Sequence, residues 1–365
     1  MRFHRHDRTA LRPTPARSPL DALRSTGGNV ASGGLRTDEV SRHAVRLVAI
    51  DRDADRIEIT AFGKLPDLLR AGDLVVVNDA ATLPASLPAR SERGDLFEVR
   101  LSGPVETNRL YGVLLGAGDH RTRTEYRAAP PKLAVGERVW LGAIASTIAS
   151  ITGRRVELVT RESGDALWQA LYASGKPVQY AHRSELLPLY AVQTAYAARP
   201  WAAEMPSAGR PLTWEVLLGL RRAGVTIATL THAAGLSSTG DEALDRALPW
   251  PERYEIPRRT IAAISKTREA NRRVIAIGTT VVRALEAAGG AGELQAGSGI
   301  ATLRLDGTSK LRVVDGLVSG LHTPGESHFD LLTAFAPAER LSRAIDLAAA
   351  QGLSSHELGD ACLIL

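Results

Sequence analysis

An alternation of apolar, strand-like runs with helical patterns in the second half of the chain is the feature that most limits the fold. The run VTIATLTH (residues 225–232) precedes the helical pattern RTIAAISKTREANR (259–272), and VIAIG (274–278) leads directly into TTVVRALEAAGG (279–290). Short apolar runs of this kind form buried strands, and strands that alternate with helices of ordinary length are typical of an α/β fold. Nearer the N-terminus, LVVVND (74–79) is a similar run that ends in two polar residues.

The segment from residue 94 to residue 160 has a different pattern. Short strand-like runs follow one another there, with Gly or Pro turns between them: FEVRLSG, RLYGVLLG, TEYRA, ERVWLG, STIASI and RRVELVT. Such spacing is typical of a small β-barrel or sandwich. The sequence therefore predicts a mixed α/β main domain formed by residues 39–93 and 161–365, with a small all-β, barrel-like domain inserted at 94–160. Within the main domain, a hairpin is expected around Asp306-Gly307.

Composition excludes several classes of protein. No apolar run approaches the length of a membrane span, and residues 1–38 are rich in Arg, Pro, Ser and Gly, which predicts a disordered basic tail rather than a signal peptide. Cys362 is the only cysteine, so we expect neither a disulfide framework nor a cysteine-based metal site, as in a cytoplasmic protein. The net charge of +5 permits an RNA or nucleotide partner, although an Arg- and Ala-rich composition gives the same balance without one.

Polar residues follow four of the apolar runs, where strands are expected to end: Asn78-Asp79, His232, Gly278-Thr279-Thr280 and His322. In α/β sheets, ligands gather beyond the carboxyl ends of the strands. Gly278 permits a sharp turn, and Thr279 and Thr280 are good N-cap residues for a helix whose first N–H groups suit an anionic ligand. An ordinary strand-to-helix connection with a capping Thr would show the same pattern.

Several segments together resemble one family. LVVVND, VQTAYA, PSAG, YEIP, RRVIAIGTTVVRALE and VVDGLVSGLHTP occur in this order, and the chain resembles the S-adenosylmethionine:tRNA ribosyltransferase-isomerase family of the queuosine pathway. The resemblance implies transfer and rearrangement of the ribosyl part of S-adenosylmethionine onto a 7-aminomethyl-7-deazaguanine base in tRNA, with epoxyqueuosine formed and adenine and methionine released. It also implies an α/β domain with an inserted β-barrel, S-adenosylmethionine as a substrate, and no metal or other cofactor.

The resemblance implies a set of site residues, each at a position that matches a family motif. The positions implied to bind substrate are Asn78, Ala208, Gly209, His232, Gly278, Thr279, Thr280 and Arg283, and those implied to carry the chemistry are Asp79, Glu252 and His322. The chain departs from the family pattern at other positions of the same motifs: Ala81, Ser86, Arg210-Pro211-Leu212, Leu248, Trp250, Gly320-Leu321 and Gly325. The scaffold therefore resembles the family more closely than the site does.

The chemistry explains why these residue types would be needed. Ribosyl transfer from a sulfonium needs a base for a proton next to the sulfur, a proton donor for the departing adenine and a neutral amine close by. Histidine side chains can serve in either proton step near neutral pH, which makes His322 a candidate for both. Asp79 could pair with a positive group of the substrate or simply form an Asx-turn, Glu252 could be a solvated charge beside Arg253, and His232 could be a hydrogen-bonded histidine at a strand end.

Two alternatives to the family reaction remain open at this point. One is a paralogue that uses the same sulfonium chemistry on a different acceptor, and the other is a binding protein that has kept the fold without turnover. The departures at Ala81, Pro211, Leu248 and Trp250 favour these alternatives. The joint presence of Asp79, Glu252, Thr279 and His322 argues against loss of turnover. The sequence does not indicate the oligomeric state.

Overall fold

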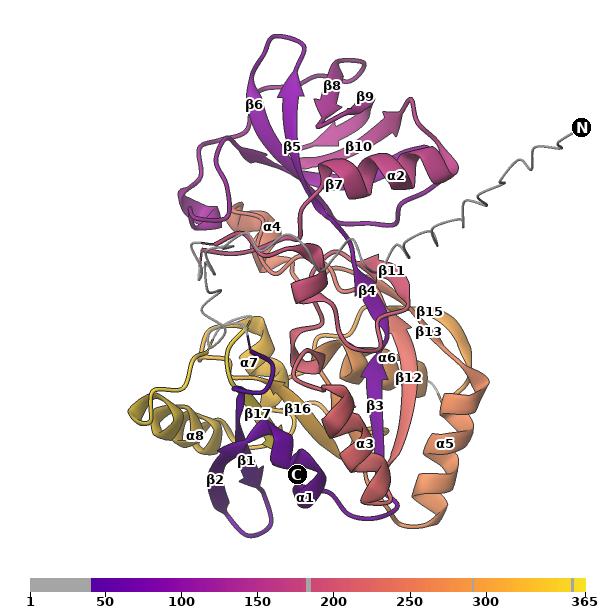
Figure 1. Ribbon diagram of the computed structural model, residues 1–365, viewed down its shortest axis with the longest axis vertical. Helices are drawn as coiled ribbons and strands as arrows, with labels where there is room; N and C mark the ends of the chain where they lie inside the picture. The colour runs from indigo at the N-terminus through magenta and orange to yellow at the C-terminus, as the bar shows by residue number, and fades with distance from the viewer. Residues whose placement is uncertain (1–40, 182–184, 291, 356–357) are drawn as a thin grey trace, which may run out of the picture. The chain divides into compact units, whose positions relative to one another are not determined.

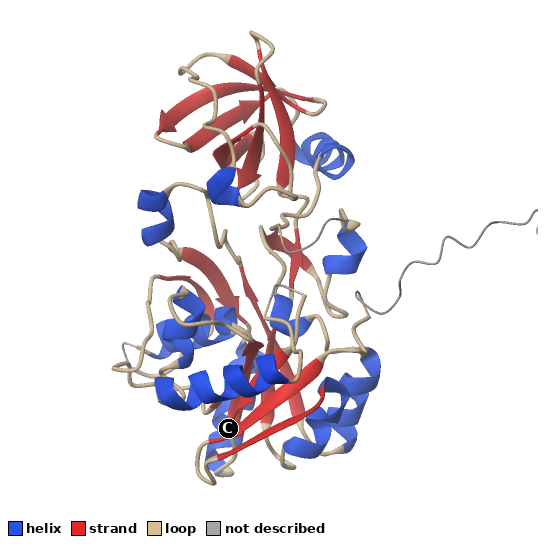
Figure 2. Ribbon diagram, turned by 90° about the vertical axis from the view of Figure 1, so that its left-hand side faces the viewer, coloured by secondary structure: helices blue, strands red, loops and turns tan. Residues whose placement is uncertain are grey.

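A computed structural model describes residues 41–181, 185–290, 292–355 and 358–365. The predicted tail, residues 1–38, lies outside the described residues. The described chain contains a nine-stranded sheet in the order β15-β13-β12-β3-β14-β16-β17-β1-β2 and a closed barrel in the order β10-β7-β6-β5-β8-β9 (Figures 1 and 2). The predicted fold class, a mixed α/β domain with an all-β barrel, is therefore confirmed. In the part of the chain that is described, every helix is too short or too polar to cross a bilayer.

The centre of the main sheet consists of four neighbouring parallel strands. They are β12 (Thr226–His232), β3 (Leu74–Asn78), β14 (Val274–Ile277) and β16 (Gly316–Gly320). All residues of β3 and β14 are buried, which explains why these strands are continuous apolar runs rather than alternating ones. Because the four strands are parallel, their carboxyl ends lie along the same edge of the sheet.

The outer strands of this sheet are mostly antiparallel to their neighbours. On one side are β13 (Glu252–Ile256) and β15 (Gly297–Ala301), and on the other are β17 (Ala361–Ile364), β1 (Arg46–Asp51) and β2 (Arg56–Ala61). The hairpin predicted around Asp306-Gly307 is wrong. Asp306 does form a local turn with Thr308 (2.9 Å), but β15 pairs with β13 while β16 pairs with β14 and β17.

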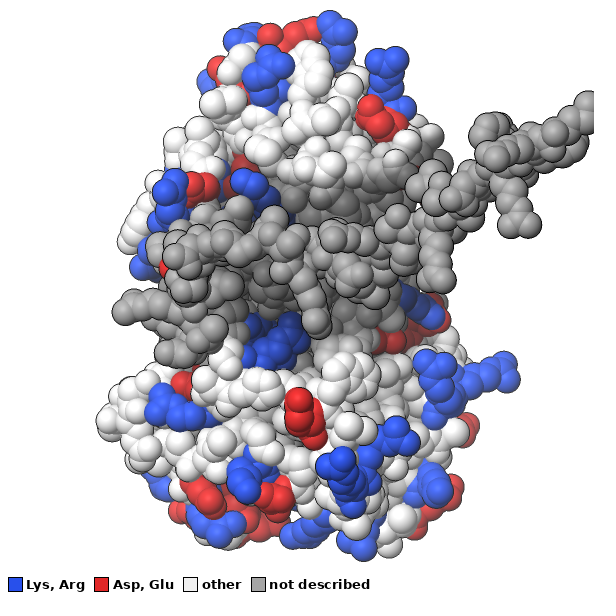
Figure 3. Space-filling view, in the orientation of Figure 1, with Lys and Arg blue, Asp and Glu red and all other residues white. Residues whose placement is uncertain are grey.

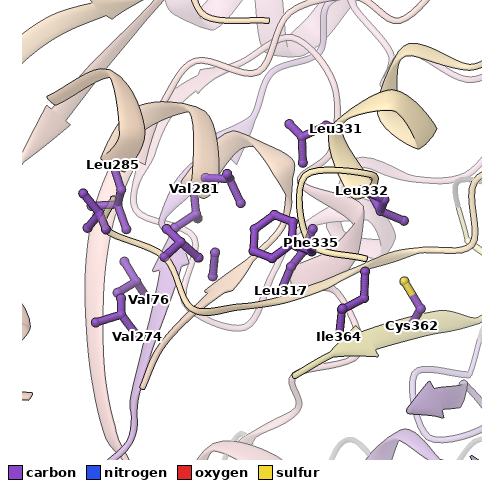
Figure 4. Close-up of a cluster of buried hydrophobic side chains, with 14 of the residues drawn as sticks. Val76, Val274, Val281, Leu285, Leu317, Leu331, Leu332, Phe335, Cys362 and Ile364 are labelled. Carbon is purple, nitrogen blue, oxygen red and sulfur yellow. The ribbon is translucent and has the colours of Figure 1, made fainter. Parts of the chain in front are cut away.

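Helices bury both faces of the main sheet, because residues along β3 and β14 alternate between two cores. Val76 and Val274 pack with Val281 and Leu285 of α6 (Thr279–Gly289) and with residues of α5, α7 and α8 (Figure 4). Val75 and Val77 pack against α1 and α3 on the opposite face. The remaining helices are α1 (Leu65–Leu68), α2 (Gly164–Ser174), α3 (Trp214–Arg222), α4 (Glu242–Arg246), α5 (Arg258–Glu269), α7 (Ser327–Leu332) and α8 (Ala338–Ala350).

The barrel is formed by strands that are each antiparallel to their neighbours, and its interior is apolar. Its strands are β5 (Ser86–Ser91), β6 (Leu96–Leu101), β7 (Arg109–Gly116), β8 (Arg138–Leu141), β9 (Ile144–Thr152) and β10 (Arg155–Thr160). The first strand lies ahead of residue 94, where the sequence placed the start of the inserted segment. Pro88 within β5 cannot donate a ladder hydrogen bond, so this stretch does not look like a strand.

A second correction concerns TEYRA, which was expected to be a barrel strand. It forms a 3-10 helix, η3 (Thr124–Tyr126), and the Arg127 side chain that follows it is buried. Five further short elements complete the described chain: η2 (Phe62–Lys64), η4 (Leu189–Val192), η5 (Ser207–Gly209) and the paired strands β4 (Ala80–Thr82) and β11 (Arg199–Ala202).

Candidate active site

The polar residues predicted at strand ends do lie along one edge of the main sheet. His232 ends β12, Asn78 ends β3, Gly278 follows β14 and His322 follows β16. The parallel pairing of these strands brings together residues that are far apart in the sequence. This edge is therefore the place where an α/β sheet of this topology holds a ligand.

Asn78 uses its side chain to connect two strands. Its Nδ2 donates to the carbonyl oxygen of His232 (2.9 Å), and its Oδ1 accepts from the backbone amides of His232 (2.9 Å) and Ala80 (3.1 Å). Nδ2 also lies 3.4 Å from Oγ1 of Thr280, at the start of α6. The side chain is buried and well hydrogen-bonded, so its contribution in this structure is to hold His232 and Thr280 in place.

Gly278 forms the turn between β14 and α6. Its φ is +95°, a conformation that L side chains rarely adopt, and its amide donates to the carbonyl oxygen of Val318 (2.7 Å). Gly278 is itself the N-cap residue. Thr279 and Thr280, which the sequence predicted to be N-cap residues, are instead the first residues of the helix. Within the described part of the chain, the amides of Thr279 and Thr280 have no acceptor, which leaves two donors at a helix N-terminus.

Ala208 and Gly209 lie beside this turn for reasons of space. A Cβ atom at Gly278 would lie 3.6 Å from the Cβ atom of Ala208, which is an ordinary contact. A Cβ atom at Gly209 would come within 2.1 Å of the Tyr196 hydroxyl oxygen, so only Gly fits there. The close approach of Tyr196, rather than a ligand, is enough to explain Gly209.

Glu252 and Arg283 form a buried ion pair. Nη1 of Arg283 contacts Oε2 of Glu252, while its other nitrogens donate to the carbonyl oxygens of Leu303 (3.1 Å), Ala301 (3.1 Å) and Trp250 (3.3 Å). The second Glu252 oxygen accepts from the amide of Gly235 (2.6 Å). Burial raises the pKa of Glu252, and the charge of Arg283 opposes that rise. The sequence-based view of Glu252 as a solvated charge is thus wrong.

His232 differs from its neighbours because its imidazole is buried without a hydrogen bond. Its side chain is fully buried, and neither Nδ1 nor Nε2 has a hydrogen-bond partner among the described residues. Nε2 lies 3.5 Å from Oε2 of Glu252. Burial, together with the positive charge of Arg283, lowers the pKa of His232 to about 3, so the ring is neutral near pH 7. Buried polar atoms normally have partners, so two unpaired ring nitrogens at the carboxyl edge of the sheet are an exception.

Asp79 keeps a partly exposed carboxylate next to this edge. Its Oδ1 accepts from Oγ1 of Thr231 (2.5 Å), and its backbone carbonyl accepts from the amide of Ala198 (2.8 Å). Burial and the Asp79 charge together raise the pKa of Tyr196, so that phenol stays protonated. Among the predicted acidic residues, Asp79 is therefore the more accessible one, whereas Glu252 is committed to Arg283.

His322 belongs to a small group of titratable side chains after β16. Nδ1 of His322 lies 3.2 Å from Oε2 of Glu326, and this contact lowers the pKa of Glu326 to about 2. The His322 ring stacks on that of His328, with centroids 4.7 Å apart and an interplanar angle of 17°. Burial, then His322 and Arg283, lower the pKa of His328 to about 4.

His328 and Glu326 were missed by the sequence analysis. The spacing of His322, Glu326 and His328 in the segment HTPGESH was the available signal, since a turn followed by a helix start folds these side chains back on one another. For the other predicted residues, the structure joins Asn78, His232 and Thr280 by hydrogen bonds, and Glu252 and Arg283 by an ion pair next to His232. Among the described residues, no group of His, Cys, Asp and Glu side chains is arranged to hold a metal ion.

The chain was compared with known proteins. The model of the queuosine biosynthesis protein family matches residues 35–364. An S-adenosylmethionine:tRNA ribosyltransferase-isomerase from Trichlorobacter lovleyi is 32% identical over 333 residues, 89% of this chain and 94% of that protein. A protein of the same name from Thermus thermophilus is 33% identical over 342 residues, 89% of this chain and 93% of that one.

A solved structure, an S-adenosylmethionine tRNA ribosyltransferase from Thermotoga maritima, also matches, with 23% identity and a TM-score of 0.49 over 89% of this chain and 94% of that one. The family match extends over both the main sheet and the barrel, and the identities with the Trichlorobacter and Thermus proteins exceed 30% over most of the chain. The chain therefore belongs to the queuosine biosynthesis protein family.

Proposed function

We propose that this protein transfers and isomerises the ribosyl moiety of S-adenosylmethionine onto a 7-aminomethyl-7-deazaguanine base in tRNA, giving epoxyqueuosine. The observation that carries the proposal is membership of the queuosine biosynthesis family over nearly the whole chain, with relatives named as ribosyltransferase-isomerases. S-adenosylmethionine is then a substrate, and the reaction needs no metal. Because tRNA is the acceptor, we expect the protein to act in the cytoplasm.

The strand-end residues suit the binding of S-adenosylmethionine. The two free amides of Thr279 and Thr280 at the start of α6 would donate to its carboxylate, because a helix N-terminus favours negative charge. The partly exposed carboxylate of Asp79 would lie against the positive part of the same molecule. We therefore assign Thr279 and Thr280 to the anionic end of the substrate and Asp79 to its cationic end.

The proton steps need a base and an acid, and the site contains candidates for both. His232 is neutral at pH 7, but its pKa of about 3 makes it a weak base, so we assign it to substrate binding rather than to proton transfer. Nδ1 of His322 contacts Glu326, and this contact orients the ring. We assign His322 to proton donation as adenine leaves, and Glu252 to fixing Arg283 beside His232 while remaining the candidate base.

A different acceptor is the second candidate function, and one observation favours it. Positions that depart from the family pattern are occupied by packing side chains: Leu212 and Leu248 are buried, and Trp250 packs against the guanidinium of Arg155 (5.0 Å). Apolar groups at these positions would contact an acceptor differently from polar ones. The acceptor base is therefore the part of the proposal that depends most on experiment.

Product release tests the proposal directly. The purified protein would be incubated with S-adenosylmethionine and tRNA that carries the 7-aminomethyl-7-deazaguanine base, and adenine and methionine would be followed by chromatography. We expect both products in equal amounts and only when the modified tRNA is present. Release of adenine with a different acceptor, but not with this tRNA, would support the second candidate, and no release with any acceptor would overturn both.

A further inference from the structure

A cavity on the wall of the barrel lies apart from the strand-end site. It has a volume of about 380 Å³, and its lining includes residues of β5, β6 and the segment 176–179, together with Leu186. Three of the lining side chains are cations, Arg100, Arg121 and Lys176, and two are carboxylates, Glu98 and Asp119. None of the residues assigned above to S-adenosylmethionine or to the proton steps lines it. The cavity therefore has no role in the reaction as proposed so far.

Arg100 carries a buried charge that the surrounding protein does not fully satisfy. The exposed fraction of its side chain is 2%; Nε donates to Oε1 of Glu98 (2.8 Å) and Nη2 to the carbonyl oxygen of Gln179 (3.3 Å). Its remaining nitrogen, Nη1, has no hydrogen-bond partner among the described residues. Buried donors of a charged group are normally paired, so this nitrogen indicates a missing acceptor.

The carboxylate next to Arg100 is shared with a second buried arginine. Glu98 also pairs with Arg127, whose side chain is fully buried, so two guanidinium groups share one carboxylate. Glu204 is a further acid whose charge raises the pKa of Arg100. Its carboxylate accepts hydrogen bonds from the Tyr180 hydroxyl and the Ser237 amide, and burial raises the pKa of Glu204. The group formed by Arg100, Glu98 and Arg127 thus has a net positive charge in a desolvated place, which an anion would stabilise.

Lys176 adds a second donor at the mouth of the cavity. Its backbone is fixed to β5 by two hydrogen bonds with Ser86, each 2.9 Å long, while its side chain is exposed. No carboxylate of the described chain lies within ion-pair distance of its ammonium group. Arg121, in contrast, is occupied by Asp119, to which it donates at 2.6–3.1 Å. Lys176 is therefore the exposed cation of the cavity that has no carboxylate partner in the described chain, whereas Nη1 of Arg100 is buried and acts through its charge.

We propose that this cavity binds a phosphate group of the RNA backbone, with the ammonium group of Lys176 as the donor and the net positive charge of the buried Arg100, Glu98 and Arg127 group attracting the anion. The inference rests on the proposed function, since it assigns part of the tRNA to the barrel. A volume of about 380 Å³ exceeds that of a single phosphate ion, and Pro88, Phe97 and Leu186 provide apolar lining for an adjoining sugar or base.

The distribution of surface charge shows why a specific phosphate site would matter for RNA binding. On the face shown in Figure 3, Lys and Arg side chains are interspersed with Asp and Glu. A mixed surface of this kind gives little net attraction for a polyanion. Specific phosphate contacts would then position the RNA, because they fix its register on the protein even though they do not read its sequence.

The proposal is tested by measuring RNA affinity at different salt concentrations. The substitutions are made at Lys176, because it is exposed and its replacement leaves the buried group of Arg100, Glu98 and Arg127 intact. The variants are Lys176→Ala, Lys176→Arg as the rescue and Lys132→Ala as the matched control, since Lys132 is an exposed barrel lysine outside the cavity. Binding of unmodified tRNA would be measured by fluorescence anisotropy. We expect Lys176→Ala to weaken binding about 3- to 10-fold at low salt and to reduce the salt slope by about 1, while the other two variants resemble the wild type.

Two further arms separate the possible outcomes. Inorganic phosphate should compete weakly for the cavity, with binding that also depends on Lys176. If phosphate binding depends on Lys176 while tRNA binding does not, the cavity is a free-anion site and the proposal is overturned. If Lys176→Ala changes neither, it is also overturned. Absence of adenine release from wild-type protein, combined with Lys176-dependent tRNA binding, would reject the proposed function alone.

Discussion

Two polar side chains at neighbouring strand ends have different surroundings, although their spacing in the sequence suggests similar roles. The Asn78 amide is hydrogen-bonded to the backbone on both sides, whereas the imidazole of His232 is buried with no hydrogen-bond partner in the described part of the chain. The first arrangement stabilises the site, and the second leaves two buried ring nitrogens whose hydrogen bonds the described protein does not supply. At the scale of single residues, function is therefore expected where hydrogen-bonding capacity is left unused.

Thr280 should contribute to S-adenosylmethionine binding through the start of α6. The change Thr280→Val keeps the shape of the side chain but removes the hydroxyl that lies near Asn78. Both backbone amides remain, but the hydrogen bond to Asn78 that positions the start of α6 is lost. We therefore expect S-adenosylmethionine to bind about 3- to 10-fold more weakly by calorimetry, with only a small change in thermal unfolding. Thr226→Val, at the exposed opposite end of β12, is the control. Equal affinity of Thr280→Val and the wild type would reject the assignment.

His322 should act in a proton step. Replacing it by Ala removes a group that is oriented by Glu326 and stacked on His328. Turnover should fall by about 10²- to 10⁴-fold, the usual contribution of a general acid or base, with S-adenosylmethionine affinity within a few fold of the wild type. His43→Ala, at an exposed position, should leave turnover unchanged. Near-normal turnover of the His322→Ala variant would mean that His322 is structural and that Glu252 or Asp79 supplies the proton.

At the scale of secondary-structure elements, one ion pair connects α6 with the outer part of the sheet. Arg283 extends from α6 to Glu252 on β13 and to the carbonyl of Ala301 on β15. The helix that begins at the Gly278 turn is thereby fixed to two antiparallel strands beyond β12. Because α6 also carries the free amides of Thr279 and Thr280, this connection determines where those donors point.

Breaking this pair should destabilise the fold strongly. Arg283→Met leaves the Glu252 carboxylate buried without a counter-charge, so we expect the free energy of unfolding to fall by about 3–5 kcal/mol in urea titrations. The double variant Arg283→Met/Glu252→Gln should recover part of this loss. The exposed pair of Arg246 and Glu242 provides the control, since Arg246→Met should have almost no effect. A small loss for Arg283→Met would show that the pair is not holding α6 in place.

At the scale of the whole molecule, two histidines with lowered pKa values couple stability to pH. The pKa of His232 is lowered to about 3 and that of His328 to about 4, both from an ordinary value of 6.5. Between these values the unfolded chain binds protons that the folded chain does not, so stability is complete above about pH 6.5 and is lost as the pH falls. Acidic conditions should therefore unfold the protein through this edge of the sheet.

The variant His328→Leu separates one of these contributions. Between pH 6 and pH 5, each of these two histidines should reduce the free energy of unfolding by about 1 kcal/mol per pH unit. Urea titrations of His328→Leu should accordingly show a shallower pH dependence than those of the wild type, while His43→Ala should not differ. An unchanged slope for His328→Leu would indicate that His328 titrates normally in the folded protein.

The sequence by itself determined the features that depend on local pattern. Continuous apolar runs became the buried parallel strands β3 and β14, the turn after β14 required Gly278, and most of the short runs between residues 94 and 160 became barrel strands. The resemblance also indicated the family correctly. These features follow from hydrophobic periodicity and backbone sterics, which are properties of neighbouring residues.

Only the tertiary structure decided which side chains meet and which remain free. Asn78 and His232 are 154 positions apart, and Glu252 and Arg283 are 31 apart, so no local pattern predicts that one pair shares hydrogen bonds and the other a charge. The same holds for the 3-10 helix at Thr124–Tyr126, for β5 with its Pro88, and for the separate partners of β15 and β16. The physical reason is that burial, pairing and pKa depend on how distant segments pack, and packing is settled by the fold as a whole.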